Sequence, residues 1–339
     1  MNECREPRAT SEVADWTGCT HSLRGTETQS ADVYRRLQGD ESGLGEFIGL
    51  PDKRRSALRN LLLRTYGAGN RLAQERAVQE LAYRELRIGA ETGLRSTRLR
   101  AVQRHGTALL LGIEHAPFLR AEAAARVLFE SHTASAQDVA AARAILDEEI
   151  RRAVATSLQP PSYSLLAEMR ADPNIDEWVD APLLLRPMFL TLANHFERDL
   201  PAWAIRTIAR APRSVQERLR ETRSWRNAVL EALRLQEWPT VLRGSPLTAR
   251  GSAQMTIVRV GQANRDPSIF AHPATFDPWR DDLPRSLSFG LGSHRCPGEG
   301  LAVTLASSLA EGALSVGLLE RSDDPALIAC WADSPTCGS

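Results

Sequence analysis

Apolar residues recur every three or four positions over much of the chain, and this spacing predicts a mainly helical protein. Residues 69–155 are rich in Ala, Arg, Glu and Leu and hold few helix breakers, so we expect helices almost throughout this region. Three of them are expected over 101–112, 121–128 and 138–154, the last beginning after Ser135. Residues 1–30 are polar and lack periodicity, which predicts a loose N-terminal segment.

A long apolar-rich segment predicts a central helix from Asp176 to Ala211. The acidic residue at its start suits the positive end of the helix dipole, and Pro212 marks its end. Pro187 and Pro201 lie inside the segment and remove backbone donors from the helix. We therefore expect a kink or a break within it.

The remaining segments predict shorter elements. Pro51-Asp52 is a helix-start signal, and a short helix is also expected within 32–44. Residues 240–243 and 255–260 are rich in β-branched and apolar residues and are expected to form strands. The tail is expected to end in an irregular or β-like segment around 327–331. The predicted fold class is mainly α with a small β region.

Composition narrows the class of protein. The chain has 339 residues with 42 basic and 42 acidic side chains, so a general attraction to nucleic acid or to a membrane surface is not expected. Its five cysteines are scattered and odd in number, which argues against a disulfide framework. The sequence has no apolar run of about 18 residues and no N-terminal signal region, so we expect a cytoplasmic location.

Residues 289–298, Phe-Gly-Leu-Gly-Ser-His-Arg-Cys-Pro-Gly, predict a tight loop that presents one cysteine. Two glycines within four residues allow the backbone to bend and to approach a flat ligand closely. Apolar residues recur at helical spacing over 301–310, so Cys296 is expected at a helix N-terminus. Unpaired N–H groups and the helix dipole favour a thiolate there. A thiolate of this kind suits the axial position of a haem iron.

This loop is similar to the haem-binding signature of the cytochrome P450 superfamily, Phe-x-x-Gly-x-x-x-Cys-x-Gly. The fixed positions are matched by Phe289, Gly292, Cys296 and Gly298, and Gly290 and His294 match frequent family choices. The resemblance implies a single P450-like haem domain over 31–339, with haem b bound through Cys296 as the metal ligand. The alternative, a structural cysteine in a Gly-rich turn, is disfavoured by further matches upstream.

Two upstream motifs support the resemblance. Glu231 and Arg234 match the Glu-x-x-Arg motif of the family, and their spacing places both charges on one helix face. Arg280 is expected to complete a buried network with them, which would be structural. Residues 264–267, Asn-Arg-Asp-Pro, match the family's segment before the cysteine loop.

The resemblance also implies residues that hold the haem. Four basic side chains are expected to anchor its propionates: Arg55, Arg59, Arg243 and His294. Phe289 is expected to pack against the thiolate loop and tune the iron. The full set of expected cofactor contacts adds Gly290, Cys296 and Gly298 of the loop and Ala193 of the central helix. For Arg55 and Arg59, a solvated basic helix face is the alternative.

The central helix departs from the family. Cytochrome P450s usually carry an acid followed by an alcohol there, which relay protons during oxygen activation. The register counted from Pro212 places His195 and Phe196 at these positions, and a shift by one residue gives Phe196 and Glu197, still without an alcohol. We therefore take His195, Phe196 and Glu197 as the candidate catalytic residues, with Ala193 beside them in the distal pocket.

Three interpretations of this departure remain open. His195 or Glu197 could carry the proton by another route, since histidine titrates near neutral pH. The enzyme could instead use peroxide, or catalyse a rearrangement, coupling or dehydration at the haem. Alternatively, Phe196 only packs over the haem, and the substrate itself supplies the hydrogen bond.

The resemblance implies a P450-like monooxygenase that oxidises a small organic substrate, in bacterial specialised metabolism. Its electrons would come from a ferredoxin and a ferredoxin reductase, with the ferredoxin docking near the Cys296 face, where arginines could meet an acidic partner. The first alternative is a P450-like haem enzyme with atypical chemistry, as described above. The second alternative is a non-catalytic P450-like module that recruits a partner.

Overall fold

The structure is a computed structural model of the 339-residue chain. It describes residues 9–24, 52–92, 95–130, 135–193, 196–236, 241–244, 255–292 and 295–316, with the backbone alone at some positions within these ranges. The helix expected within 32–44 and the segment expected around 327–331 lie outside the described residues.

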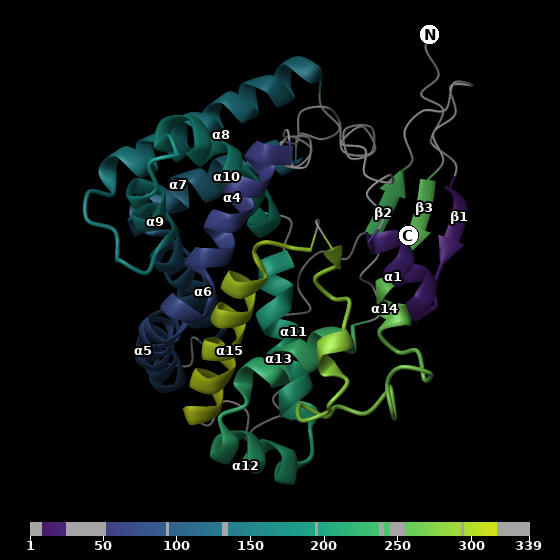
Figure 1. The fold of residues 1–339 in the computed structure, drawn as a ribbon. Helices are drawn as coiled ribbons and strands as arrows, with labels where there is room; N and C mark the ends of the chain where they lie inside the picture. The colour runs from purple at the N-terminus through teal and green to yellow at the C-terminus, as the bar shows by residue number, and fades with distance from the viewer. Residues whose placement is uncertain are drawn as a thin grey trace.

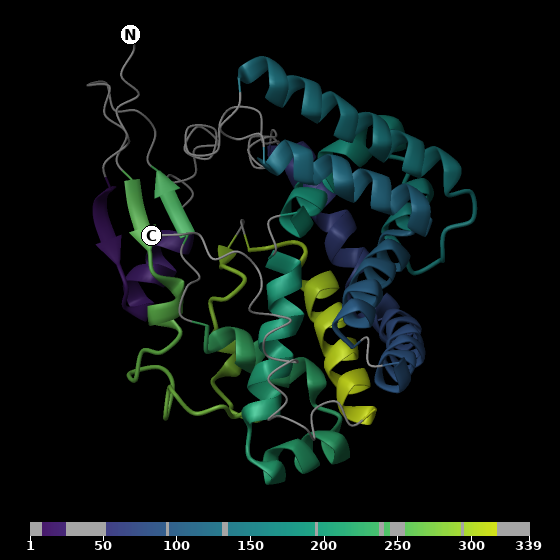
Figure 2. The same cartoon turned by 180° about the vertical axis from the view of Figure 1, so that it is seen from behind.

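Helices dominate the described chain, as the apolar spacing predicted. In Figure 1 the helices α5–α8 lie on the side of the molecule opposite the strands, and Figure 2 shows the same division from behind. The described residues up to 193 form α1 (Trp16–Arg24), α4 (Asp52–Thr65), α5 (Ala68–Thr92), α6 (Arg95–Leu111), α7 (His115–Glu130), α8 (Ala136–Thr156), α9 (Leu165–Ala171) and α10 (Glu177–Ala193). The remaining α-helices are α11 (Phe196–Arg210), α12 (Arg213–Thr222), α13 (Trp225–Arg234), α14 (Val260–Ala263) and α15 (Glu299–Ser315).

The local signals placed several helix ends correctly. Ser135 caps α8, because its hydroxyl accepts the N–H of Asp138 at 3.2 Å. Gly112 follows α6 with a φ of +78°, which ends the helix in a conformation that glycine adopts without strain. α4 begins at Asp52, as its start signal predicted. α7 begins at His115, several residues before the segment expected from apolar spacing, because its first turn is not strongly apolar.

The sheet has three strands in the order β1-β3-β2. β2 (Val241–Gly244) and β3 (Met255–Val258) are antiparallel and confirm the two strands expected from the sequence. β1 (Ala9–Val13) pairs with β3 in parallel. A short 3₁₀ turn, η2 (Leu283–Arg285), lies in the segment between the sheet and α15.

The expectation of a loose segment over residues 1–30 is wrong for residues 9–24. They form β1 and a helix, α1 (Trp16–Arg24), which lies beside the sheet in Figure 1. Cys19 and Leu23 of α1 are buried against Val258 and Leu287. The segment is ordered by partners more than 200 positions away, so its own polar composition gave no sign of this order.

The segment predicted as a central helix is helical on both sides of residues 194–195. The structure has α10 up to Ala193 and α11 from Phe196, and residues 194–195 between them lie outside the described residues. Pro187 lies within α10 and Pro201 within α11. Both helices continue past these prolines, so the kink or break expected within the segment stays a prediction.

The charge network of Glu231, Arg234 and Arg280 is confirmed. Arg234 donates to both carboxylate oxygens of Glu231, at 2.7 and 2.8 Å, and Arg280 donates from Nε at 3.0 Å. Glu231 and Arg234 are fully buried. Arg234 also donates to the carbonyl groups of Asn264 and Pro273, each at 2.8 Å. The network therefore joins α13 to the segment that leads into the cysteine loop.

Within the described residues, none of the helices combines the length and the apolar character that crossing a membrane requires.

We expect Glu231→Gln to destabilise the protein strongly. The substitution keeps the side-chain shape but leaves two arginines without their buried counter-charge, at a cost of about 3–5 kcal/mol. Glu217→Gln is the matched control, because Glu217 pairs with Arg213 at an exposed site on α12 and should change stability by less than about 1 kcal/mol. Urea unfolding of both variants measures the difference, and equal losses would contradict a structural role for the network.

Two histidines meet where α6 and α7 join. The ring centroids of His105 and His115 are 3.5 Å apart. Burial lowers the pKa of each imidazole below its ordinary value. At His105, the charge of Glu85 raises the pKa and that of Arg84 lowers it. At His115, the charges of His105 and Arg104 lower the pKa and that of Glu122 raises it. Burial therefore disfavours the protonated form of both rings in the folded protein.

We expect the free energy of unfolding to fall as pH drops through about 6.5. The unfolded chain binds protons at these histidines before the folded protein does, so acidification favours unfolding. Denaturant titrations between pH 7.5 and 5.5 should show a shallower decline for His115→Gln than for the wild type. His21→Gln, on the exposed face of α1, serves as the control and should keep the wild-type slope. An unchanged slope in His115→Gln would refute the assignment.

Candidate active site

The cysteine loop is closed by backbone hydrogen bonds that require glycine. Gly290 and Gly292 have φ values of +73° and +75°, which side chains rarely adopt. The N–H of Gly290 donates to the carbonyl of Leu287 at 2.8 Å, and the N–H of Cys296 donates to the carbonyl of Phe289 at 2.7 Å. The turn therefore brings the backbone of Cys296 back beside that of Phe289.

Cys296 lies at the N-terminus of α15, as expected. Gly298 is the N-cap of this helix, and Glu299 is its first residue. The backbone N–H groups of Gly298 and Glu299 both act on the Cys296 sulfur. A Cβ atom added at Gly298 would lie 3.7 Å from that sulfur, so the missing side chain leaves the sulfur uncovered on this side. The helix end therefore offers two donors to a thiolate.

Several neighbouring groups shift the pKa of the Cys296 thiol, some upward and some downward. Cys296 carries a free thiol and is exposed as a residue, yet neighbouring protein atoms keep part of the water away from its sulfur. Those surrounding atoms raise the pKa of the thiol by removing water, and the Glu299 charge also raises it. The N–H groups of Gly298 and Glu299 and the charge of Arg59 lower it. A positive charge placed at the sulfur, such as a metal ion, would also lower the pKa of the thiol.

Arg59 reaches the cysteine loop from α4. Its guanidinium donates to the carbonyl oxygen of Arg295, the residue before Cys296. Burial lowers the pKa of Arg59, whereas the charge of Cys296 raises it. Arg55 lies one turn earlier on the same helix, is partly exposed, and its charge repels that of Arg59. The structure therefore places Arg59 at the cysteine and Arg55 beside Arg59.

The residue that follows α4 packs closely against the first turn of α15. A Cβ atom at Gly300 would lie 2.6 Å from both the Cβ and the carbonyl oxygen of Tyr66, the residue that follows α4. Only glycine allows this approach without a backbone shift. Leu58 and Leu62, on either side of Arg59 in α4, are buried in the main core. Sequence reasoning did not identify Gly300, because a glycine in an apolar helix gives no sign of its neighbour.

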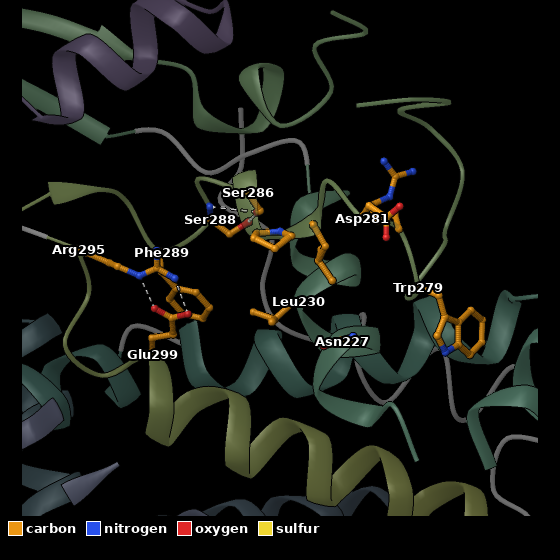
Figure 3. Close-up of a pocket in the computed structure, with 12 residues that line it drawn as sticks. Asn227, Leu230, Trp279, Asp281, Ser286, Ser288, Phe289, Arg295 and Glu299 are labelled. Atoms are coloured by element: carbon orange, nitrogen blue, oxygen red, sulfur yellow. Dashed lines mark hydrogen bonds and ion pairs between the residues drawn. The ribbon is translucent and has the colours of Figure 1, made fainter. Parts of the chain in front are cut away.

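A hollow with a volume of about 470 Å³ lies beside the cysteine loop. Figure 3 shows Arg295 and Glu299 at one end and Trp279 at the other. Arg295 donates to both oxygens of Glu299, at 2.6 and 2.8 Å. Other lining residues come from α13 and from the segment before the loop: Asn227, Leu230, Arg280, Asp281, Leu283, Pro284, Ser286, Ser288 and Phe289. Sequence reasoning missed Arg295 and Glu299, although their i,i+4 spacing allows pairing in a helix.

Phe289 packs inward from the loop. It is 8% exposed and belongs to a cluster with Leu200, Val229, Leu233 and Val303. These residues come from α11, α13 and α15, so the ring fixes the loop to three helices. The expected packing of Phe289 against the thiolate loop and its effect on the iron stay predictions.

Several candidate residues are not described beyond the backbone. His195 and His294 lie outside the described residues. Ala193 ends α10, Phe196 and Glu197 begin α11, and Arg243 lies in β2, but their side chains are not described. The roles of these residues, and the propionate contacts of Arg55 and Arg59, stay predictions.

Comparison with known sequences gives one short match. No protein-family model matches the chain. A biotin biosynthesis cytochrome P450 from Bacillus subtilis (strain 168) is 48% identical over 56 residues. The aligned stretch is 16% of this chain and 14% of that protein.

Comparison with solved structures extends over most of the chain. CalO2 has a TM-score of 0.72 and 21% identity, with 90% of this chain and 82% of CalO2 covered. P450BioI in complex with an acyl carrier protein ligated to hexadec-9Z-enoic acid has a TM-score of 0.71 and 17% identity, covering 90% and 85%. The cytochrome P450 CYP109B1 from Bacillus subtilis has a TM-score of 0.68 and 20% identity, covering 90% and 85%. The chain therefore has the cytochrome P450 fold, as its sequence motifs predicted.

Proposed function

We propose that the protein is a haem–thiolate oxidative enzyme, a P450-like monooxygenase that acts on a small organic substrate in bacterial specialised metabolism. One observation carries the proposal. In a chain with the cytochrome P450 fold, the exposed residue Cys296 lies just before the N-terminus of α15, where the backbone N–H groups of Gly298 and Glu299 lower the pKa of its thiol.

The donors around Cys296 fit the iron of a haem b. Cys296 would bind the metal as a thiolate, and the N–H groups of Gly298 and Glu299 would share its negative charge. The glycine at position 298 leaves the sulfur uncovered on one side. The expected propionate partners remain Arg55, Arg59, Arg243 and His294, of which Arg59 lies at the loop itself.

A haem bound through a thiolate supplies the oxidising chemistry, because the sulfur donates electron density to the iron. The chain supplies position and charge. Phe289 fixes the loop by burying its ring among α11, α13 and α15. On the distal side, we propose that His195 or Glu197 holds the proton that the reaction consumes, and that Phe196 and Ala193 shape the pocket.

Electrons would come from a ferredoxin and its reductase. The hollow in Figure 3 borders the cysteine loop and would receive the ferredoxin. Arg295 there is already paired with Glu299, so an acidic group of the partner would have to compete with that carboxylate.

We keep the cytoplasmic location as a prediction from the sequence.

The second candidate function is a P450-like haem enzyme with atypical chemistry: peroxide-dependent oxidation, rearrangement, coupling or dehydration. One observation favours it. Neither register of the central segment around His195 and Phe196 supplies an alcohol for the usual proton relay.

We expect the haem-loaded protein, reduced and exposed to carbon monoxide, to show the difference band of a thiolate-ligated haem. Cys296→Ser should lose that band, because an alcohol is a far weaker ligand than a thiolate. Cys19→Ala is the matched control and should keep it, since Cys19 is buried between α1 and the sheet. A wild-type protein without the band would disprove the proposed function.

Turnover then separates the candidate chemistries. Oxidation of a substrate panel with ferredoxin, reductase and dioxygen supports the monooxygenase. Product formed with peroxide alone, or with neither oxidant, supports the atypical enzymes. A thiolate band without product under any of these conditions supports the non-catalytic recruitment module.

A further inference from the structure

One peptide unit links Arg295 to Cys296, and both of its polar groups are hydrogen-bonded within the protein. The carbonyl oxygen of Arg295 accepts a hydrogen bond from Arg59, which lies 236 positions earlier in the chain. The N–H of Cys296 donates to the carbonyl of Phe289 at 2.7 Å. Because a peptide unit is planar, fixing both groups fixes the orientation of the plane. The direction in which Cys296 leaves the backbone is therefore constrained from two sides.

The residues that hold this unit are themselves fixed. Leu58 and Leu62, next to Arg59 on α4, are buried in the main core. The Arg295 side chain is held by two hydrogen bonds to Glu299. Tyr66, which follows α4, lies against Gly300 of α15, so the end of α4 is held close to the helix that begins after the loop. A charged donor gives a stronger hydrogen bond than a neutral one.

We propose that Arg59 is a positioning residue that orients the Arg295–Cys296 peptide unit and so prepares the cysteine loop before the cofactor arrives. The inference rests on the proposed function and adds a role to the expected one. A propionate contact would act only in the haem-loaded protein. The contact with the Arg295 carbonyl acts with or without haem.

Hydrogen exchange tests the proposal on the full-length chain, prepared both haem-loaded and haem-free. The variant is Arg59→Gln, which removes the charge and shortens the reach of the donor. We expect the amide of Cys296 to exchange on the order of tenfold faster in both forms, as loss of one charge-assisted hydrogen bond implies. The rate at which Cys296 is alkylated in the haem-free protein, followed by peptide mass spectrometry, should also differ between Arg59→Gln and the wild type.

Arg64→Gln is the matched control, since Arg64 lies on the same helix but pairs with Asp172 on the side away from the loop. It should leave both readouts at the wild-type values. Should Arg59→Gln fail to fold, Arg59→Lys carries the same comparison, because it keeps the charge but not the planar donor group.

Two results would overturn the proposal. Exchange and alkylation at Cys296 could remain unchanged in Arg59→Gln, which would mean that the contact does not constrain the loop. A change confined to the haem-loaded protein would assign Arg59 to the propionates alone. Neither result depends on the carbon-monoxide band of the wild type, so failure here is distinguishable from failure of the proposed function.

Discussion

The burial of a carboxylate between two arginines is the constraint on which the segment leading into the cysteine loop depends. Glu231 has no access to water, so Arg234 and Arg280 must stay in place to balance its charge. Arg234 in turn holds the carbonyl of Asn264. The Asn264 side chain accepts the N–H of Leu287 at 2.7 Å, just before the cysteine loop. A charge pair on one helix thus determines where the loop begins.

The loop is supported from a second direction by α4 and α15. The charge network fixes the segment that enters the loop, whereas Arg59 and the Gly300–Tyr66 contact fix the segment that leaves it. Cys296 lies between these supports, and its backbone N–H is bound inside the loop itself. Two independent sets of contacts therefore hold the backbone that positions the Cys296 sulfur. A metal ligand needs such support when its geometry must be maintained.

The two sides of the proposed haem site contribute differently to function. The proximal side provides a thiol, donors and a fixed loop, and these features suit any haem–thiolate chemistry. The choice of reaction depends on the distal side, where the segment around His195 and Phe196 differs from the usual acid and alcohol. Securing the iron ligand and selecting the reaction are thus carried by separate parts of the chain.

The sequence by itself determined the features whose cause is local. Positive-φ glycines, the cap at Ser135 and the helical spacing after Cys296 follow from the conformations that neighbouring residues allow. The network around Glu231 was also predictable, because a known motif supplied its distant partner. Only the tertiary structure decided that β1 joins the sheet, that Arg59 binds the Arg295 carbonyl, and that Gly300 receives Tyr66. These contacts join positions more than 200 residues apart, and no local pattern of side chains encodes which of many compatible surfaces will meet.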